Sequence, residues 1–458
     1  MRPPHQLPER PRLEGTPLEN MFDRLLSPFQ AFVHHQTTGG LVLMAAAVAA
    51  LLLANSPWAA GYQHLWHTPV AIGGGPWVLA LSLHGWVNEG LMALFFLMVG
   101  LEIKRELLVG ELSAPRQAAL PIVAAVGGMV VPALIYAGIN PGGAEARGWG
   151  VPMATDIAFA VGALVLLRHR VPAALSIFLV ALAIVDDLGA VLVIALFYTA
   201  QLDLRAALVA AALFLLLVML SRLGVRRLAP YFIVATLLWL ALLKSGIHST
   251  IAGVLMAFTV PARARYDSTR FSDYLRALLG RYDRSVQADR NPLRNEELRA
   301  LIDTIGEGVK KVQPPAARLE SALHAPVTLL IVPLFAFVNA GIPLGLADLS
   351  EAAQSRVSWG VALGLVLGKF IGIGGAAYLA VRVNLAQLPH GVRMPHIFGA
   401  ALFGGIGFTM AIFIAELAFK GHAEMLVAAK TGILVASALA GLLGYIWLRW
   451  LGRGARVE

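Results

Sequence analysis

A small set of polar residues lies within stretches that are otherwise apolar, and these residues have the chemistry to hold a cation or a proton. They are Glu89, Thr155, Asp156, the adjacent acids Asp186 and Asp187, and Lys369. An ionised side chain at the centre of a membrane helix costs about 2.5–3.5 kcal/mol on insertion scales, so such residues are functional candidates by default. Carboxylate oxygens bind either a proton or a hard cation. An exchange of protons for cations requires at least that the two compete for the same carboxylates.

Asp186, Asp187 and Lys369 are expected at the same depth in the membrane. Asp186 lies 14 residues after the start of an apolar stretch at 172–199, and Lys369 lies 12 residues from either end of 357–381. At about 1.5 Å per residue, each lies near the middle of a bilayer. Neighbouring helical residues point about 100° apart, so one aspartate can meet an ion while the other pairs with Lys369. A purely structural ion pair is the alternative for Lys369, and a structural hydrogen bond is the alternative for Glu89.

The composition places the elements that carry these residues in lipid. Of 458 residues, 58% are hydrophobic and 14% are charged, and the mean hydropathy is +0.72. Soluble domains have about 45–50% apolar and 25% charged residues, so a soluble enzyme is excluded. The absence of cysteine excludes a disulfide scaffold, thiol catalysis and cysteine-ligated metal. A window of about 20 residues predicts twelve membrane spans. They cover 31–55, 79–101, 117–139, 150–167, 172–199, 206–221, 229–244, 246–261, 324–341, 357–381, 395–419 and 423–448.

The distribution of lysine and arginine predicts the orientation of these spans. Of the 36 basic residues, 29 fall in the tails and alternate connections on one side, and 5 fall on the other side. Short cytoplasmic connections retain the excess of lysine and arginine, so both termini are expected in the cytoplasm. The net charge of +9 is therefore a topology signal, and it does not call for nucleic acid as a partner.

Two tails and two long connections complete the expected organisation. Residues 1–30 and 449–458 are expected as polar cytoplasmic tails around a membrane domain at 31–448. The long cytoplasmic connection 262–323 carries a helical pattern, and the alternatives for it are a regulatory segment or a solvated spacer. The pattern consists of Leu298, Leu301, Ile302, Ile305 and Val309. The extracytoplasmic connection 56–78 has glycines at 73–75 between 64–72 and 76–82, which favours a β-hairpin over a plain loop.

Two of the expected spans contain helix breakers and hydroxyl groups. The interruptions lie at 151–160 in span 4 and at 404–410 in span 11. Paired discontinuous helices in two inverted halves mark the ion site of many secondary transporters. Spans 3–5 and 10–12 start on opposite sides of the membrane, and we expect them to form two inverted repeats. Glycines at 364, 368 and 372 provide a small-residue face for close helix packing beside Lys369.

Taken together, the motifs of the chain resemble those of the bacterial NhaA sodium/proton antiporters. They lie at 88–96, 100–106, 154–160, 183–190, 333–341, 368–369 and 404–410. The resemblance implies an all-α polytopic membrane protein of the inner membrane that needs no cofactor. It also implies electrogenic exchange of cytoplasmic sodium or lithium for external protons. The family's hairpin dimerises, which implies a homodimer through residues 56–78.

The resemblance also assigns roles to individual residues. Asp186 and Asp187 match the proton and sodium carriers, with Asp186 paired to Lys369, and Thr155 and Asp156 match the unwound helix crossing. Glu89 stands where the family often has aspartate on the ion path. The positions that match pH activation are Glu102, Arg105, Glu106, His248 and Glu320. A lone histidine such as His248 is equally often an interhelical hydrogen-bonding residue.

Three other classes of protein share some of these features. An intramembrane aspartyl protease needs two aspartates on facing helices, whereas Asp186 and Asp187 are adjacent on one helix. A sodium-coupled solute symporter stays open as an alternative, and sodium transport without an organic solute would exclude it. A passive channel is disfavoured because an Asp–Lys pair at mid-depth is typical of exchange at one occluded site.

Overall fold

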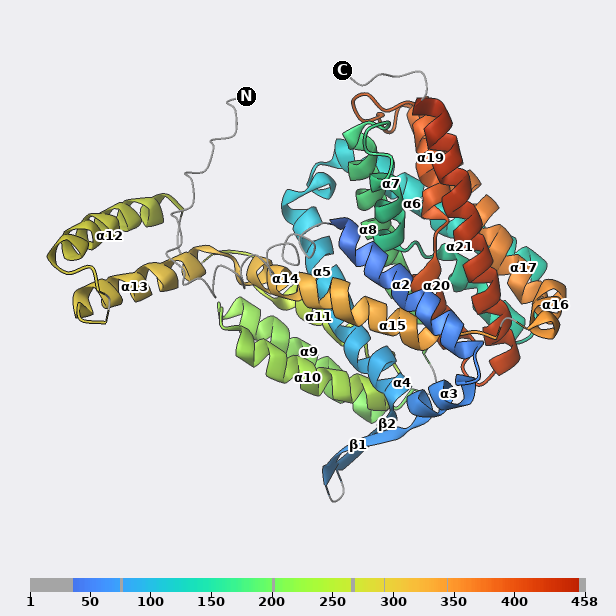
Figure 1. The fold of residues 1–458 in the computed structure, drawn as a ribbon, viewed down its shortest axis with the longest axis horizontal. Coiled ribbons are helices and arrows are strands. Elements are labelled where there is room, and N and C mark those ends of the chain that lie inside the picture. The colour runs from blue at the N-terminus through green and yellow to red at the C-terminus, as the bar shows by residue number, and fades with distance from the viewer. Residues whose placement is uncertain are drawn as a thin grey trace.

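The computed structural model describes residues 36–74, 77–199, 202–264, 268–291, 293–343 and 345–452. Within these ranges, eight helices are long and apolar enough to cross a membrane, or up to ten if each of two bent helix pairs counts as one span. The chain is therefore an all-α polytopic membrane protein with one small sheet (Figure 1). Both expected tails lie largely outside the described residues, and the number of twelve spans stays a prediction.

The N-terminal half begins with a bent helix and the hairpin and continues into long apolar helices. Its elements are α2 (Gln36–Ala54), α3 (Ala59–His67), β1 (Pro69–Gly74), β2 (Trp77–Ser82), α4 (Leu83–Gly85), the π-helix η1 (Trp86–Leu91), α5 (Met92–Val109), the 3-10 helix η2 (Glu111–Ser113), α6 (Pro115–Ile139), the 3-10 helix η3 (Glu145–Met153), α7 (Ile157–Val165), α8 (Ala173–Phe197), α9 (Leu204–Arg222), α10 (Leu228–Ser245) and α11 (Ile251–Thr259).

The C-terminal half contains an additional helical pair and then the second set of long helices. Its elements are α12 (Ser268–Ala288), α13 (Glu296–Val312), α14 (Pro315–Pro326), the π-helix η4 (Val327–Ile331), α15 (Val332–Asn339), α16 (Leu346–Gln354), α17 (Arg356–Leu363), the π-helix η5 (Gly364–Gly368), α18 (Lys369–Arg382), α19 (Met394–Gly404), α20 (Phe408–Ala418) and α21 (Ala423–Leu451).

Two expected spans fall short of the length and composition of a simple apolar helix. The span expected at 79–101 begins in strand β2 and continues through α4 and η1 into α5, whose last two turns carry charged residues. In the span expected at 246–261, only the nine residues of α11 form a helix. Glycine at 246 ends α10 with a φ of +82°, a backbone conformation that other residues rarely adopt. The hydropathy window averages over such breaks and does not detect them.

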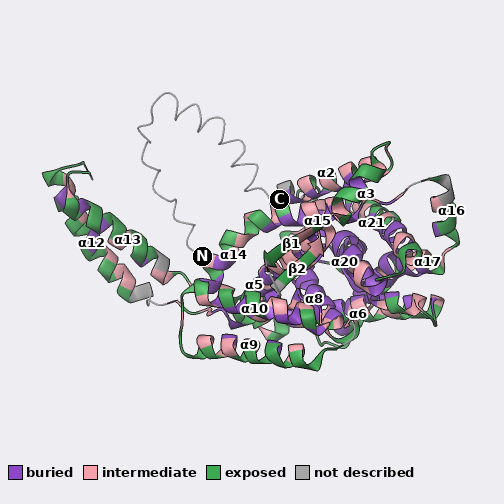
Figure 2. Cartoon of the chain, turned by 90° about the horizontal axis from the view of Figure 1, so that it is seen from below, coloured by how far each residue is buried: buried purple, intermediate pink, exposed green. Residues whose placement is uncertain are grey.

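The helices pack in two sets. In the set that we call the site helices, α6 packs against α18 and α8, and α21 packs against α17, α19 and α20. In the set that we call the flanking helices, α5 packs against α11 and α14, α9 against α10, and α15 against α2. Figure 2 shows buried residues concentrated on central helices such as α8 and α20, while α9 exposes most of its surface. Lipid is the natural solvent for such an exposed apolar helix.

Glycine allows α6 and α18 to approach closely. A methyl group on Gly127 would lie 2.3 Å from the carbonyl oxygen of Gly372, and one on Gly368 would lie 2.8 Å from the Cα of Pro132. Side chains at these positions would push the two backbones apart. The glycine face predicted beside Lys369 therefore packs against α6.

The expected β-hairpin is present, with shifted boundaries. Strand β1 pairs antiparallel with β2, and Val70 lies opposite Leu81. Residues 64–67, expected in the first strand, belong to helix α3 instead, and residues 75 and 76 of the turn lie outside the described residues. The indole N–H of Trp86 donates to the carbonyl of Val70 at 3.0 Å, which ties the hairpin to the start of the second span.

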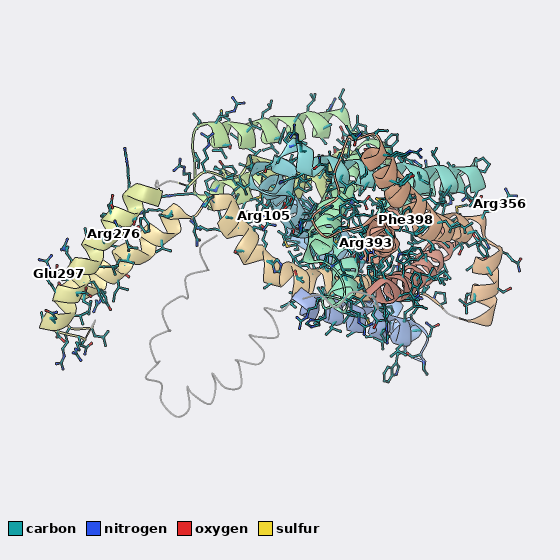
Figure 3. All side chains as sticks on the ribbon, turned by 90° about the horizontal axis from the view of Figure 1, so that it is seen from above. Arg105, Arg276, Glu297, Arg356, Arg393 and Phe398 are labelled. Carbon is teal, nitrogen blue, oxygen red and sulfur yellow. The ribbon has the colours of Figure 1, made fainter. Side chains whose placement is uncertain are left out.

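The long connection 262–323 forms a helical pair that projects from the membrane bundle. The helix expected from the apolar pattern is α13, and it packs against α12. Figure 3 labels Arg276 and Glu297 on this pair, far from Arg105 on the main body. Asn295 caps the start of α13 by accepting a hydrogen bond from the N–H of Leu298 at 3.0 Å.

Candidate functional site

Two interrupted helices cross beside each other at the centre of the site helices. The chain is not helical between η3 and α7 at 154–156, nor between α19 and α20 at 405–407, where the two helices meet at a bend of 48°. The N–H of Asp156 donates to the carbonyl of Ile406 at 2.7 Å, and the hydroxyl of Thr155 donates to the carbonyl of Gly404 at 2.7 Å. Non-helical backbone is tolerated at this depth because the two breaks satisfy each other's polar groups.

Asp156 lies between the N-termini of two half-helices. One carboxylate oxygen accepts from the N–H of Phe159 at 3.1 Å in the first turn of α7. The other oxygen accepts from the N–H of Thr409 at 3.1 Å and from the Thr409 hydroxyl, both in the first turn of α20. Unpaired N–H groups give a helix N-terminus a partial positive charge, and a carboxylate stabilises it. Thr155 contacts the carbonyl end of α19, so the two residues serve opposite helix ends.

Asp186 and Lys369 form an ion pair between α8 and α18. The Lys369 Nζ atom donates to Oδ2 of Asp186 at 2.8 Å, and the two side chains are 0% and 1% exposed. Lys369 is the first residue of α18 and directly follows the π-helix η5. A π-helix inserts one extra residue per turn, so it changes the direction in which the following side chains point.

Asp187 shares this buried environment without a matching positive charge. Its side chain is 2% exposed, and within the described part of the chain it forms no ion pair. Its Oδ1 atom, like Oδ1 of Asp186, is buried and accepts no hydrogen bond from any described residue. The charged groups that act on it are Asp186, Glu102, Asp156 and Lys369. Buried polar atoms without a partner are rare in native proteins, so this oxygen has the chemistry expected of a ligand site.

The residues matched to pH activation fall into two separate clusters. Arg105 on α5 lies 3.0 Å from Glu320 on α14, 3.1 Å from Glu106 and 3.9 Å from Glu102. These groups are partly exposed, and the cluster joins α5 to α14 at one end of the bundle. His248 lies outside this cluster.

His248 instead contacts Glu89, the acidic residue of span 2. Its Nδ1 atom lies 3.4 Å from Oε2 of Glu89, and the hydroxyl of Ser249 donates to the same oxygen at 2.6 Å. The aromatic ring of Phe413 on α20 packs against His248 at 5.2 Å between ring centroids. Glu89 therefore joins η1 to the loop before α11 and lies in a cluster separate from Asp186 and Lys369.

Sequence reasoning missed three hydroxyl residues that complete these contacts. Thr409 binds Asp156, Ser249 binds Glu89, and the hydroxyl of Ser437 accepts from the N–H of Phe408 at 3.2 Å. Hydroxyl residues in helices often bond to their own backbone, so their presence alone carries little signal. The hydroxyl group noted within 404–410 is that of Thr409, two residues after the glycine-rich break, and this was the one available indication.

Together the fold and the site define a multi-pass membrane protein with buried carboxylates beside two interrupted helices. A sequence model of the family described as Na+/H+ antiporter 1 matches residues 30–448. The Na+/H+ antiporter NhaA 1 of Saccharophagus degradans is 50% identical over 434 residues, which cover 95% of this chain and 94% of that protein. The NhaA antiporter of Sulfurimonas denitrificans is 49% identical over 439 residues, which cover 96% of this chain and 99% of that protein. The chain belongs to the NhaA family of Na+/H+ antiporters, as its motifs predicted.

Proposed function

We propose that this antiporter exchanges ions at the carboxylate of Asp187, with Asp186 as the second carrier. The observation that carries the proposal is the buried, unpartnered Oδ1 of Asp187 next to the Asp186–Lys369 pair. A sodium or lithium ion supplies the positive charge that Asp187 lacks, and a proton neutralises the same group. Because the two ligands occupy one carboxylate, each displaces the other.

The crossing of the two interrupted helices supports the same assignment. Asp156 offsets the partial positive charge of the two helix N-termini, and Thr155 donates to the carbonyl end of α19, so a transported cation does not face an unpaired helix N-terminus. Sodium enters from the cytoplasm, and more protons than sodium ions cross per cycle, which makes the exchange electrogenic. The two inverted three-helix repeats, spans 3–5 and 10–12, supply one interrupted helix each.

The proposal extends to regulation and assembly. The Arg105 cluster with Glu102, Glu106 and Glu320 responds to cytoplasmic pH, and His248 and Glu89 contribute through the second cluster. The protein lies in the bacterial inner membrane with both termini in the cytoplasm. Two copies associate through the hairpin in the connection 56–78, where Ile72 and Val78 expose apolar side chains.

Everted membrane vesicles test the proposed site. Addition of sodium or lithium to vesicles that hold a proton gradient should collapse the gradient with the native chain and leave it intact with Asp187→Asn. Asp203→Asn is the matched control, because Asp203 is exposed and caps α9. Sodium-dependent collapse that survives in Asp187→Asn refutes the assignment, and a requirement for an organic solute favours a symporter.

A further inference from the structure

A second polar cluster joins the flanking helices to the site helices near the β-hairpin. We call it the hairpin-side cluster. Its members are His84 on α4, Asn88 on η1, Asn339 at the end of α15, Glu416 on α20 and Lys430 on α21. Helix α4 directly follows strand β2, so the cluster lies on the side of the bundle that carries the hairpin. None of its members belongs to the exchange site or to the two clusters matched to pH activation.

The site helices contribute a tight ion pair to this cluster. The Lys430 Nζ atom lies 2.5 Å from Oε1 of Glu416, with side chains that are 11% and 13% exposed. Removing two charges from water is costly, and the pair is stable only because each partner neutralises the other. Glu416 is thereby held as a fixed acceptor on the surface that faces the flanking helices.

The flanking helix α15, together with α4 and η1, which lead into the flanking helix α5, contributes a hydrogen-bonded set of neutral groups and one imidazole ring. Asn88 and Asn339 bond to each other at 2.9 and 3.3 Å, and Nε2 of His84 lies 3.0 Å from Oδ1 of Asn339. The same Nε2 atom lies 3.7 Å from Oε1 of Glu416. Imidazole is the side chain whose charge ordinarily changes between pH 5 and 8. His84 is the one imidazole of this cluster, among the described residues, and it faces the other set of helices.

The charges around His84 determine the sign of its effect. Glu416 faces it from α20, Lys430 lies behind Glu416 on α21, and the ring of His67 on α3 stacks at 6.4 Å. Glu89 on the same π-helix as Asn88 points away toward Ser249 and His248. A protonated His84 is attracted to the carboxylate of Glu416. Lys430 weakens this attraction, because its ammonium group already pairs with Oε1 of Glu416, the same oxygen that faces His84. The remaining attraction is that of a weak, partly exposed ion pair.

From this geometry we propose that His84 is a positioning residue that closes the hairpin side of the transport path by contacting Glu416 when it is protonated. The inference rests on the proposed exchange function, because alternating exposure of one site requires that each side close in turn. Acid on the hairpin side then keeps this side closed. Loss of the proton weakens the contact between the two sets of helices and favours opening toward the hairpin side.

The absence of cysteine in the chain makes accessibility a direct test. Ala336→Cys places a single thiol on α15, one turn before Asn339, at a position that is 0% exposed. A membrane-impermeant maleimide is added to right-side-out vesicles, and the labelling rate is measured at several pH values between 6 and 8. The same rates are measured with His84→Gln, which keeps a donor for Asn339 and carries no charge. The ratio of the two rates cancels the pH dependence of the thiol itself.

We expect the rate with His84 to be about one third or less of the rate with His84→Gln at the most acidic pH, and the two rates to converge as the pH rises. Glu416→Gln should label fast in either background, without a difference between them. His64→Gln is the matched control, since His64 is exposed on α3, and it should behave like the native residue. Ala415→Cys, also 0% exposed, repeats the test from α20.

A rate ratio that does not change with pH, or a fast rate with His84 already at pH 6, overturns the proposal. Sodium-driven proton movement is recorded in the same vesicles, so the two proposals fail separately. If exchange is normal and the ratio of the labelling rates does not change with pH, only the role proposed for His84 is refuted. If vesicles whose protein keeps Asp186 and Asp187 show no sodium-driven proton movement, the proposed exchange function is refuted.

Discussion

The buried ion pair between Asp186 and Lys369 makes a quantitative prediction about stability. Removing either partner, as in Asp186→Asn or Lys369→Met, leaves the other charge buried without compensation, at a cost of about 3–5 kcal/mol. The double variant leaves neither charge buried, so its cost should lie well below the sum, with a coupling energy of about 3 kcal/mol. In large domains 1 kcal/mol shifts Tm by about 2 °C, so each single change should lower Tm by about 6–10 °C.

Thermal unfolding of the four purified proteins in detergent measures this cycle. The double variant should recover several degrees relative to the more damaged single variant. The exposed pair Lys311 and Glu307 at 2.7 Å is the control cycle, in which a coupling below about 1 kcal/mol is expected. Additive losses in Tm for Asp186 and Lys369 would refute the view that each charge depends on the other.

Three further predictions concern the helix crossing, the glycine contact and the pH response. Thr409→Val should lower Tm by about 3–6 °C relative to Thr409→Ser, because it removes the hydroxyl that donates to Asp156, and a hydrogen bond to a charged group contributes about 1.5–3 kcal/mol. Equal Tm values for the two variants would show that this hydrogen bond is dispensable. Gly127→Ala should lower Tm, because the new methyl group meets the carbonyl of Gly372, whereas Gly138→Ala places its methyl group in open space and should leave Tm unchanged. Equal Tm values for the two variants in thermal unfolding would contradict the close packing of α6 against α18. Arg105→Gln should shift the pH profile of exchange toward alkaline values: burial raises the pKa of Glu102 and Glu320 and the Arg105 guanidinium lowers it, so both carboxyls keep their protons to higher pH without Arg105. An unchanged profile would count against a sensing role.

Much of the fold could be predicted because membrane insertion constrains the sequence strongly. Apolar length located most spans, and the cost of charge in lipid singled out Asp186, Asp187 and Lys369. Their common depth predicted a contact between one of the aspartates and Lys369, the family resemblance indicated Asp186, and the structure places that contact at 2.8 Å. Helix breakers in spans 4 and 11 likewise indicated the two interruptions.

The remaining contacts depend on features that a single sequence does not encode locally. The rotation of one helix about its axis decides whether His248 meets Glu89 or Arg105, and no spacing rule fixes that rotation between segments about 150 residues apart. The π-helices at 86–91 and 364–368 change side-chain directions, and the glycines that they contain are too common in membrane helices to mark such a change. The pairing of His84 with Glu416 across more than 300 residues is of the same kind.

In the mechanism that we propose, sodium and protons compete for the carboxylate of Asp187. Calorimetry of sodium binding to the purified protein, repeated in buffers of different ionisation enthalpy, gives the number of protons released for each sodium ion bound. The native protein should release at least one proton for each sodium ion bound near neutral pH, and Asp187→Asn should bind no sodium. Sodium binding without proton release would contradict this mechanism.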